Sequence, residues 1–123
     1  MTAEELVARA EAVAVNAYAP YSSYHVGATV LTKDGRLYDG VNVENAAYPL
    51  TVCAEKTAIA KAASDGVRPG ELEAIGITAS PCGGCRQWLV EWQIPEVSFR
   101  RADGTIATYA AAELLPDTWE LPG

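Results

Sequence analysis

The chain carries Cys53-Ala54-Glu55 and, further along, Pro81-Cys82-Gly83-Gly84-Cys85, and these two stretches contain all three of its cysteines. Three thiolates can occupy three corners of a tetrahedral Zn²⁺ site and leave the fourth corner for water or substrate. Residues i and i+2 of a helix point to different sides, so Glu55 is better placed as a general base over the open corner than as a fourth ligand. A closed structural site would need one more ligand, and the chain offers only His25. The pattern therefore predicts a catalytic zinc site.

Length, charge and cysteine content narrow the class of protein. The chain has 123 residues, half of them hydrophobic, with no linker-like stretch or internal repeat, so we expect one domain spanning residues 1–123. A formal net charge of −7 disfavours a nucleic-acid polymer as partner, because phosphate backbones need basic surfaces. The acidic, periodic N-terminal segment is typical of neither a signal peptide nor a membrane span. Cysteines without an export signal indicate reduced thiolates, and we expect a cytoplasmic protein without membrane contact.

Periodicity and turn residues predict elements in the order α-β-β-α-β-α-β-β-α. Asp34-Gly35 and Asp103-Gly104 each indicate a turn between two strands. Ser80 followed by Pro81 suits an N-cap and a first helical position. The expected helices cover residues 2–17, 53–63, 81–92 and 110–114, and the expected strands cover residues 26–32, 36–41, 73–79, 97–100 and 105–109. A hairpin followed by alternating helices and strands predicts a mixed sheet with helices on its faces.

Two of the cysteines, Cys53 and Cys82, are then expected at or near helix N-termini. Three thiolates give a bound Zn²⁺ excess negative charge, and the partial positive charge and free N–H groups of helix N-termini offset it. Lys56 and Arg86 each follow a key residue directly. We expect their positive charges to support the site in the same way.

Together these residues resemble the small homotetrameric cytidine deaminases with three zinc-binding cysteines, and the likeness runs nearly end to end. Zinc deaminases as a class combine a ligand-x-Glu motif with a later P-C-x-x-C motif. The resemblance implies an α/β fold, a three-layer α-β-α sandwich with a mixed five-stranded sheet. It also implies one Zn²⁺ per subunit, bound by Cys53, Cys82 and Cys85. The segments that carry the resemblance, in order and at family-like spacing, are Tyr18–Ser22, Val26–Ala28, Gly40–Ala46, Cys53–Glu55, Ser80–Gln87 and Leu114–Pro116.

The activity implied by this resemblance is hydrolytic deamination of cytidine and deoxycytidine to uridine and deoxyuridine, with release of ammonia, as a step of pyrimidine salvage. Zinc would lower the pKa of its water from about 15.7 towards about 7. Glu55 would take a proton from that water and deliver it to pyrimidine N3. It would then protonate the amino group as that group leaves.

The resemblance also implies substrate contacts for a small-molecule nucleoside. Asn42 and Glu44 match the family's ribose-binding pair, and their i, i+2 spacing on an extended segment puts both side chains on one side. Tyr24 matches a position that packs on the pyrimidine, and the backbone of Ala54 matches one that contacts the base carbonyl. The carbonyl near Ser80 and Pro81 matches one that contacts the leaving amine. Ala46, Tyr48 and Trp119 match positions that reach a neighbouring subunit's site. A homotetramer with shared sites is therefore implied.

Three departures from the family pattern surround the expected pocket: Lys56 replaces a common Arg, Pro49 replaces a usual Gly, and Tyr24-His25 replaces a pair such as Phe-Pro. They leave open a deaminase of a modified cytosine nucleoside, of the blasticidin S type, which shares the zinc motifs and differs at the ribose-binding pair. A different alternative is a non-catalytic zinc module in which His25 closes the site. That alternative predicts four protein ligands and gives Glu55 no role.

Overall fold

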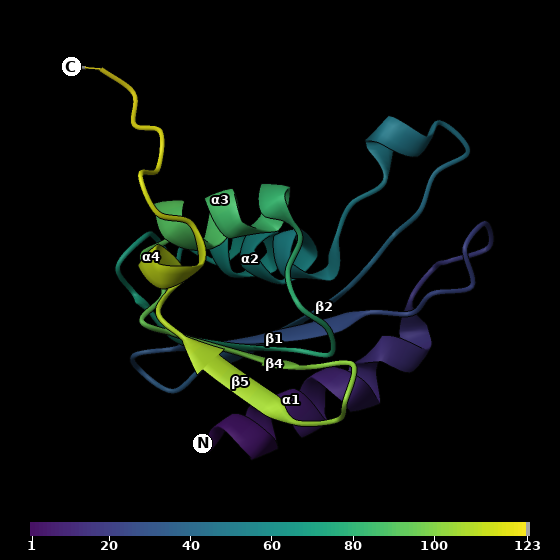
Figure 1. Cartoon of the computed structure of the whole chain (residues 1–123), viewed down its shortest axis with the longest axis horizontal. Coiled ribbons are helices and arrows are strands. Elements are labelled where there is room, and N and C mark those ends of the chain that lie inside the picture. The colour runs from purple at the N-terminus through teal and green to yellow at the C-terminus, as the bar shows by residue number, and fades with distance from the viewer. Residues whose placement is uncertain (123) are drawn as a thin grey trace.

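The computed structural model describes residues 1–122 and shows a mixed β-sheet between two layers of helices (Figure 1). In chain order the elements are α1 (Ala3–Val13), a 3₁₀ turn η1 (Ala14–Asn16), β1 (Gly27–Thr32), β2 (Leu37–Val41), a second 3₁₀ turn η2 (Tyr48–Leu50), α2 (Ala54–Ser64), β3 (Leu72–Ile77), α3 (Gly83–Glu91), β4 (Glu96–Arg100), β5 (Ile106–Tyr109) and α4 (Ala111–Leu114). Helix α1 covers one face of the sheet, and α2 and α3 cover the other, with α4 beside α3. No helix in this described part is both long and apolar enough to cross a membrane.

The five strands of the sheet have the order β2-β1-β3-β4-β5. Strands β3 and β4 run parallel, with Ile75 opposite Val97, and the other three neighbouring pairs are antiparallel. A parallel pair needs a crossover connection, and α3 supplies it. The predicted three-layer α/β sandwich with a mixed five-stranded sheet is therefore confirmed. Cys82 and Cys85 lie at the start of the crossover helix.

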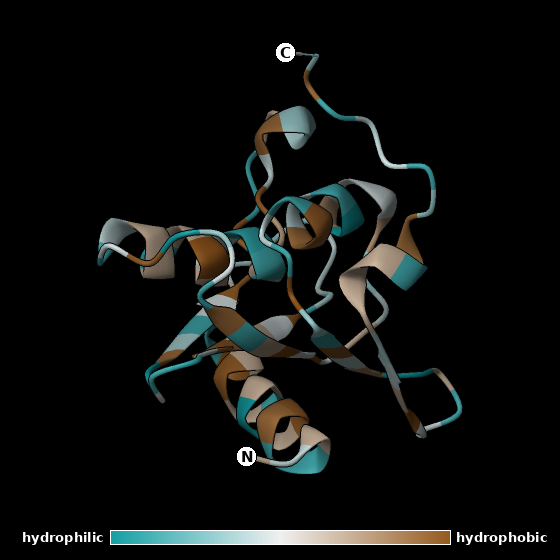
Figure 2. Ribbon diagram, turned by 90° about the vertical axis from the view of Figure 1, so that its left-hand side faces the viewer, coloured by the Kyte–Doolittle hydropathy of each residue, from teal (hydrophilic) through white to brown (hydrophobic). Residues whose placement is uncertain are grey.

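Hydrophobic side chains pack on both faces of the sheet. All six residues of the interior strand β1 are buried, as expected for a strand between two helical layers. Helix α1 buries Leu6 and Val7 against one face, and brown and teal segments alternate along it in Figure 2, as for a helix with one buried side. On the other face, Ala58 and Ile59 of α2 and Leu89 of α3 are fully buried. The single five-stranded sheet is thus the middle layer, with a helical layer packed on each of its faces.

Helix α2 lies directly on the backbone of β2 because position 40 is a glycine. A Cβ atom at Gly40 would lie 2.3 Å from the backbone nitrogen of Ala58. Real Cβ atoms essentially never come that close to another heavy atom, so any other residue would force the helix and the strand apart. The absence of a side chain at this position therefore sets how closely α2 approaches the sheet.

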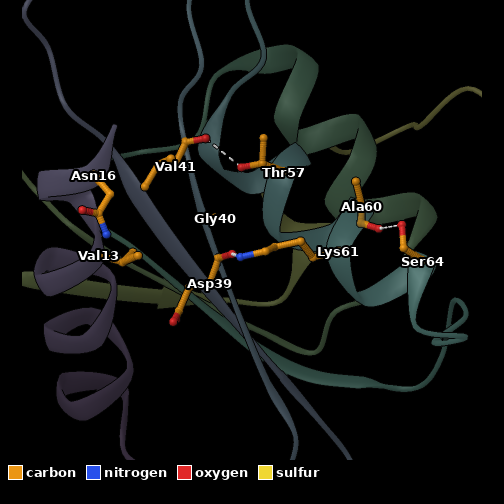
Figure 3. A pocket seen from close by; sticks show the side chains of 9 residues that line it. All are labelled: Val13, Asn16, Asp39, Gly40, Val41, Thr57, Ala60, Lys61 and Ser64. Atoms are coloured by element: carbon orange, nitrogen blue, oxygen red, sulfur yellow. Dashed lines mark hydrogen bonds between the residues drawn. The ribbon is translucent and has the colours of Figure 1, made fainter. Parts of the chain in front are cut away.

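Two side chains of α2 also bind the backbone of β2, and they line a hollow between α1, β2 and α2 (Figure 3). The Thr57 hydroxyl donates a hydrogen bond to the Val41 carbonyl at 2.7 Å, and the Lys61 ammonium donates one to the Asp39 carbonyl at 2.8 Å. These bonds fix α2 along β2, so the first turn of α2 is held at a set position. The hollow has a volume of about 550 Å³ and is lined by none of the predicted site residues.

The predicted start of the third helix is wrong. We expected Ser80 as N-cap and Pro81 as the first helical residue, but Cys82 is the N-cap and α3 begins at Gly83. The physical reason is that the Ser80 hydroxyl accepts a hydrogen bond from the Arg86 guanidinium and is not used for capping. The shift brings a cysteine to the N-cap of α3, and Cys53 is likewise the N-cap of α2. The expectation that both cysteines lie at helix N-termini is confirmed.

Candidate zinc and nucleoside site

The three cysteines come together at the N-termini of α2 and α3. Their sulfur atoms all lie within 4.8 Å of one another. Tetrahedral zinc with Zn–S bonds of about 2.3 Å sets its sulfurs about 3.8 Å apart, so a small closure would bring this cluster onto an ion. Soft thiolates also select zinc over hard cations such as Mg²⁺ and Ca²⁺. Cys53, Cys82 and Cys85 therefore fit a zinc ion with one corner left open.

Neither His25 nor Glu55 belongs to this cluster. In residues 1–122 it is the only group of three or more His, Cys, Asp and Glu side chains placed to hold a metal ion. His25 is exposed, and its charge acts on Glu44. The non-catalytic alternative, in which His25 closes the zinc site, is therefore not supported by the arrangement.

The thiols differ in their protonation. Hydrogen bonding from Cys85, with smaller contributions from Cys82 and the positive charge of Lys56, lowers the pKa of Cys53 to about 6 against the opposing effect of burial. The same hydrogen bond to Cys53, together with burial, raises the pKa of Cys85. Cys53 thus becomes a thiolate at a lower pH than Cys85. A soft anionic ligand is then present at neutral pH.

Glu55 lies in the first turn of α2, and its side chain is only 4 % exposed. Burial raises the pKa of its carboxyl group, although its own backbone N–H and the Cys85 thiol donate opposing hydrogen bonds. A carboxyl group whose pKa is raised towards neutral can both accept and return a proton. It faces a cavity of about 220 Å³ lined by Tyr24, Val26, Asn42, Thr51, Cys53, Ala54, Glu55, Ala79, Ser80 and Cys82.

Asn42 lines this cavity and uses its amide to hold the loop before β1. Its Oδ1 atom accepts a hydrogen bond from the Val26 backbone N–H at 2.8 Å, and its Nδ2 atom donates one to the Tyr24 carbonyl at 2.8 Å. The side chain is 8 % exposed. Asn42 thereby sets the position of Tyr24, the residue expected to pack on the pyrimidine.

Glu44 lies in a different hollow, of about 410 Å³, together with Tyr21, Ser22, Tyr48 and Thr51. Its carboxylate accepts hydrogen bonds from the backbone N–H groups of Tyr21 and Ser22, at 2.9 and 3.1 Å, and from the Ser22 hydroxyl. These contacts lower the pKa of Glu44, with the Ser22 hydroxyl making the largest contribution. The structure therefore does not bring the two members of the expected ribose-binding pair into one hollow.

Thr51 connects the two hollows, because it lines both of them. Neither the sequence motifs nor the family resemblance indicated this residue. One signal could have found it: Thr51 precedes Cys53 by two residues on an extended segment, so the two side chains point to the same side. The backbone pairing of Val43 with Val52 places Thr51 beside the segment that carries Glu44.

The residues expected to serve a neighbouring subunit are all exposed, and none of them lines the Glu55 cavity of its own chain. Ala46 is exposed, and Tyr48 is 71 % exposed, with its ring packed edge-on against Tyr21. Pro49, a departure from the family pattern, fits the first turn of η2, where its fixed φ is compatible with the helix. Trp119 lines a hollow of about 470 Å³ on its own α3, together with Gln87, Trp88, Glu91 and Trp92.

The two supporting charges act differently from each other. The Lys56 ammonium lies 6.0 Å from the ring centroid of Trp88, and its charge helps to lower the pKa of Cys53. The Arg86 guanidinium instead donates hydrogen bonds to oxygen atoms of Ser80, Pro81 and Leu114. Of the two positive charges predicted to support the thiolates, only that of Lys56 acts on a thiol, the one of Cys53.

The fold and this cysteine cluster define a zinc-binding deaminase, and comparison with known proteins agrees. Residues 1–101 match the family model described as the cytidine and deoxycytidylate deaminase zinc-binding region. This chain belongs to that family. The predicted resemblance is confirmed, as is zinc as the family's cofactor.

Individual relatives are similar over almost the whole chain. A cytidine deaminase of Sporosarcina psychrophila is 42 % identical over 125 residues, which cover 94 % of this chain and 90 % of the relative. A cytidine deaminase of Halalkalibacterium halodurans is 40 % identical over 124 residues, covering 94 % and 92 %. The crystal structure of cytidine deaminase from Burkholderia pseudomallei superposes with a TM-score of 0.90 at 42 % identity, covering 97 % of this chain and all of that one.

Proposed function

We propose that this protein is a zinc-dependent cytidine deaminase, which hydrolyses cytidine and deoxycytidine to uridine and deoxyuridine and releases ammonia. One observation carries the proposal: a buried carboxyl group, Glu55, faces a small cavity beside three clustered thiols. Relatives that are 40–42 % identical to this chain carry the name cytidine deaminase. The reaction serves pyrimidine salvage in this proposal.

In the proposed reaction, Glu55 moves the protons. A Zn²⁺ ion held by the three cysteines would lower the pKa of water towards about 7 and so supply a nucleophile for pyrimidine C4 at neutral pH. The Glu55 carboxylate accepts a proton in the cavity and delivers it to N3. It next takes the proton of the hydroxyl group added at C4 and passes it to the amino group, which leaves as ammonia while the oxygen stays on C4 as a carbonyl. The raised pKa of the buried Glu55 suits a group that must both take up and release protons.

The cavity and the neighbouring hollow suggest how a nucleoside lies in the site. The base occupies the Glu55 cavity, between Tyr24 and the walls formed by Ala54 and Ser80. The sugar extends past Thr51 towards Glu44, since Thr51 lines both hollows. In this arrangement Asn42 and Glu44 bind the nucleoside at two different places.

The proposed enzyme is a homotetramer in the cytoplasm. Ala46, Tyr48 and Trp119 then contribute to sites of neighbouring subunits, which is supported by the exposure of these residues and by the open hollow around Glu44. All three cysteines are free, and free metal-binding thiols need a reducing compartment.

The decisive test is turnover of cytidine by the zinc-loaded protein, followed as loss of ultraviolet absorbance on conversion to uridine. Glu55→Gln should lower kcat by at least about 100-fold while zinc content stays at wild-type level, because the variant lacks the proton carrier. Glu73→Gln, on the exposed side of β3, is the matched control and should leave kcat unchanged. A zinc-bound wild type that deaminates blasticidin S or another cytosine analogue, but neither cytidine nor deoxycytidine, would reject the proposed substrate.

A further inference from the structure

We propose that Arg86 is a positioning residue for this reaction: its guanidinium holds the Ser80–Pro81 segment, whose Ser80 lines the Glu55 cavity, in the orientation that the leaving amine requires. The inference rests on the proposed deaminase function. It gives Arg86 a role through hydrogen-bond geometry, where sequence analysis expected a supporting charge for the thiolates.

The guanidinium reaches three separate points of the chain. Its Nε atom donates to the Pro81 carbonyl at 3.0 Å, its Nη2 atom to the Ser80 hydroxyl at 3.2 Å, and its Nη1 atom to the Leu114 carbonyl at 3.1 Å. All three nitrogen atoms are thus directed at oxygen atoms of the protein. Only a planar fork of donors satisfies three acceptors in fixed directions, and the single ammonium of a lysine cannot reproduce it.

The Ser80–Pro81 segment has few other means of holding its place. It lies between the end of β3 at Ile77 and the N-cap of α3, outside any ladder of backbone hydrogen bonds. Pro81 has no N–H group, so its carbonyl is the only backbone group through which it can be tied. Arg86 makes that tie from the first turns of α3. The segment is therefore fixed by the same helix that carries Cys85.

This arrangement selects one carbonyl for the substrate. The resemblance to the deaminase family left open which carbonyl near Ser80 and Pro81 meets the leaving amine. The Pro81 carbonyl already accepts the Arg86 Nε–H, whereas the Ser80 carbonyl accepts no hydrogen bond within residues 1–122. Ser80 also lines the Glu55 cavity. Arg86 thus occupies one acceptor and leaves the Ser80 carbonyl free for the amine.

The third bond joins this wall to the C-terminal part of the chain. Leu114 is the last residue of α4, and the segment that carries Trp119 follows it. A rotation of the Arg86 guanidinium would therefore disturb the cavity wall and the start of this segment together.

The test compares Arg86→Lys and Arg86→Met with the same two substitutions at Arg68. Arg68 is a matched control, because its Nη1 atom also donates to two backbone carbonyls, those of Ala63 and Val67, both at 2.9 Å, at the far end of α2. We expect kcat for cytidine to fall about 100-fold in Arg86→Met and about 10-fold in Arg86→Lys, since small misplacements at a reacting centre have effects of this size. The Arg68 variants should keep kcat within about 3-fold of wild type. Zinc per chain should stay at the wild-type value in all four.

A second readout separates positioning from folding. If Arg86 acts through Ser80, then Ser80→Ala should lower kcat by a smaller factor in the Arg86→Met background than in the wild type. Additive effects, an unchanged kcat in the Arg86 variants, or a loss of zinc that accounts for their loss of activity would each overturn the inference. Wild-type enzyme without turnover of any cytosine nucleoside would instead reject the proposed function, and this inference with it.

Discussion

The hollow around Glu55 and the hollow around Glu44 share Thr51 but are built in different ways. The first is formed at the ends of regular elements: two helix N-caps and the segment after β3 supply its cysteines and its wall. The second is formed by loops, with Tyr48 largely exposed. The groups that we propose to perform the chemistry are thus placed by the sheet and its helices, whereas Glu44, which we expect to bind the sugar, lies among loop residues.

This difference shows which parts of the site one chain can complete alone. Buried Glu55 and the clustered thiols are in place without any partner. The Glu44 hollow is bounded mostly by exposed side chains, those of Tyr21, Ser22 and Tyr48, and in the proposed tetramer residues of another copy would complete it. Catalytic chemistry and substrate affinity should therefore respond differently to substitution.

The largest expected effect is on the hollow around Glu55, when one of its three cysteines is removed by Cys82→Ser. Cys82 is exposed at the N-cap of α3, so its replacement should leave the fold intact and remove one of three ligands. We expect zinc affinity to fall at least about 100-fold and turnover to be lost with it. Competition with a chromophoric chelator measures the affinity, and circular dichroism checks the fold. A variant that retains one tightly bound zinc per chain would show that the cluster is not the metal site.

An intermediate effect is expected in the hollow around Glu44, from the substitution Glu44→Gln. This substitution keeps the shape of the side chain and removes the negative charge of the carboxylate, whose Oε1 atom accepts hydrogen bonds from the backbone N–H groups of Tyr21 and Ser22. We expect KM for cytidine to rise about 10-fold with kcat changed less than about 3-fold, because a binding contact is weakened and the chemistry is not. Glu71→Gln is the control, since Glu71 also accepts a backbone hydrogen bond, from Arg68, away from both hollows. A fall in kcat equal to the fall in kcat/KM would place Glu44 in the chemical step.

The smallest effect is expected outside both hollows, at Asp39 of β2, which binds Arg9 of α1 and Thr29 of β1. Burial alone would raise the pKa of Asp39, but hydrogen bonds from Arg9 and Thr29 outweigh it and lower that pKa below its usual 3.8. A lowered folded-state pKa stabilises the protein above pH 3.8, and this contribution is lost as the pH falls through the folded-state value. Asp39→Asn should therefore lower the free energy of unfolding by about 1 kcal/mol at pH 7.

The measurement for this last prediction is urea unfolding of wild type and Asp39→Asn at pH 7 and pH 3, with zinc removed by a chelator in every sample. The difference between the two proteins should shrink at the lower pH, where the wild-type carboxylate becomes protonated. A difference that stays equal at both pH values would mean that the charge of Asp39 contributes nothing.

The clustering of the three cysteines near Glu55 could be predicted because the residues concerned lie in two short sequence motifs. Cys53 and Glu55 lie within three residues, and a C-x-x-C motif at a helix start admits few geometries. The five strands and the mixed sheet also followed from turn residues and periodicity, and the three-layer fold is confirmed, whereas the order of the strands within the sheet was not predicted. The start of α3 was wrong because Ser80 is held by Arg86, a contact that no local pattern reports.

The Glu44 side was harder to predict because it depends on how loops pair. The i, i+2 argument for Asn42 and Glu44 assumed an extended segment and could not report that β2 ends at Val41, just before this pair. Beyond β2, Val43 pairs with both Tyr18 and Val52, and Glu44 lines a different hollow from Asn42. The position of Trp119 against its own α3 likewise depends on packing of the C-terminal segment, which carries no periodic signal.

Gly40 has a consequence for metal selectivity, although it carries no functional group. A methyl group there would act as a wedge against the backbone nitrogen of Ala58 and tilt α2 away from the sheet. Because Cys53 is on α2 while Cys82 and Cys85 are on α3, such a tilt would widen the gap between thiols on separate helices. The close packing of α2 on β2 at Gly40 therefore helps to set the distance between Cys53 and the other two thiols. The size of ion that the cluster accepts depends on that distance.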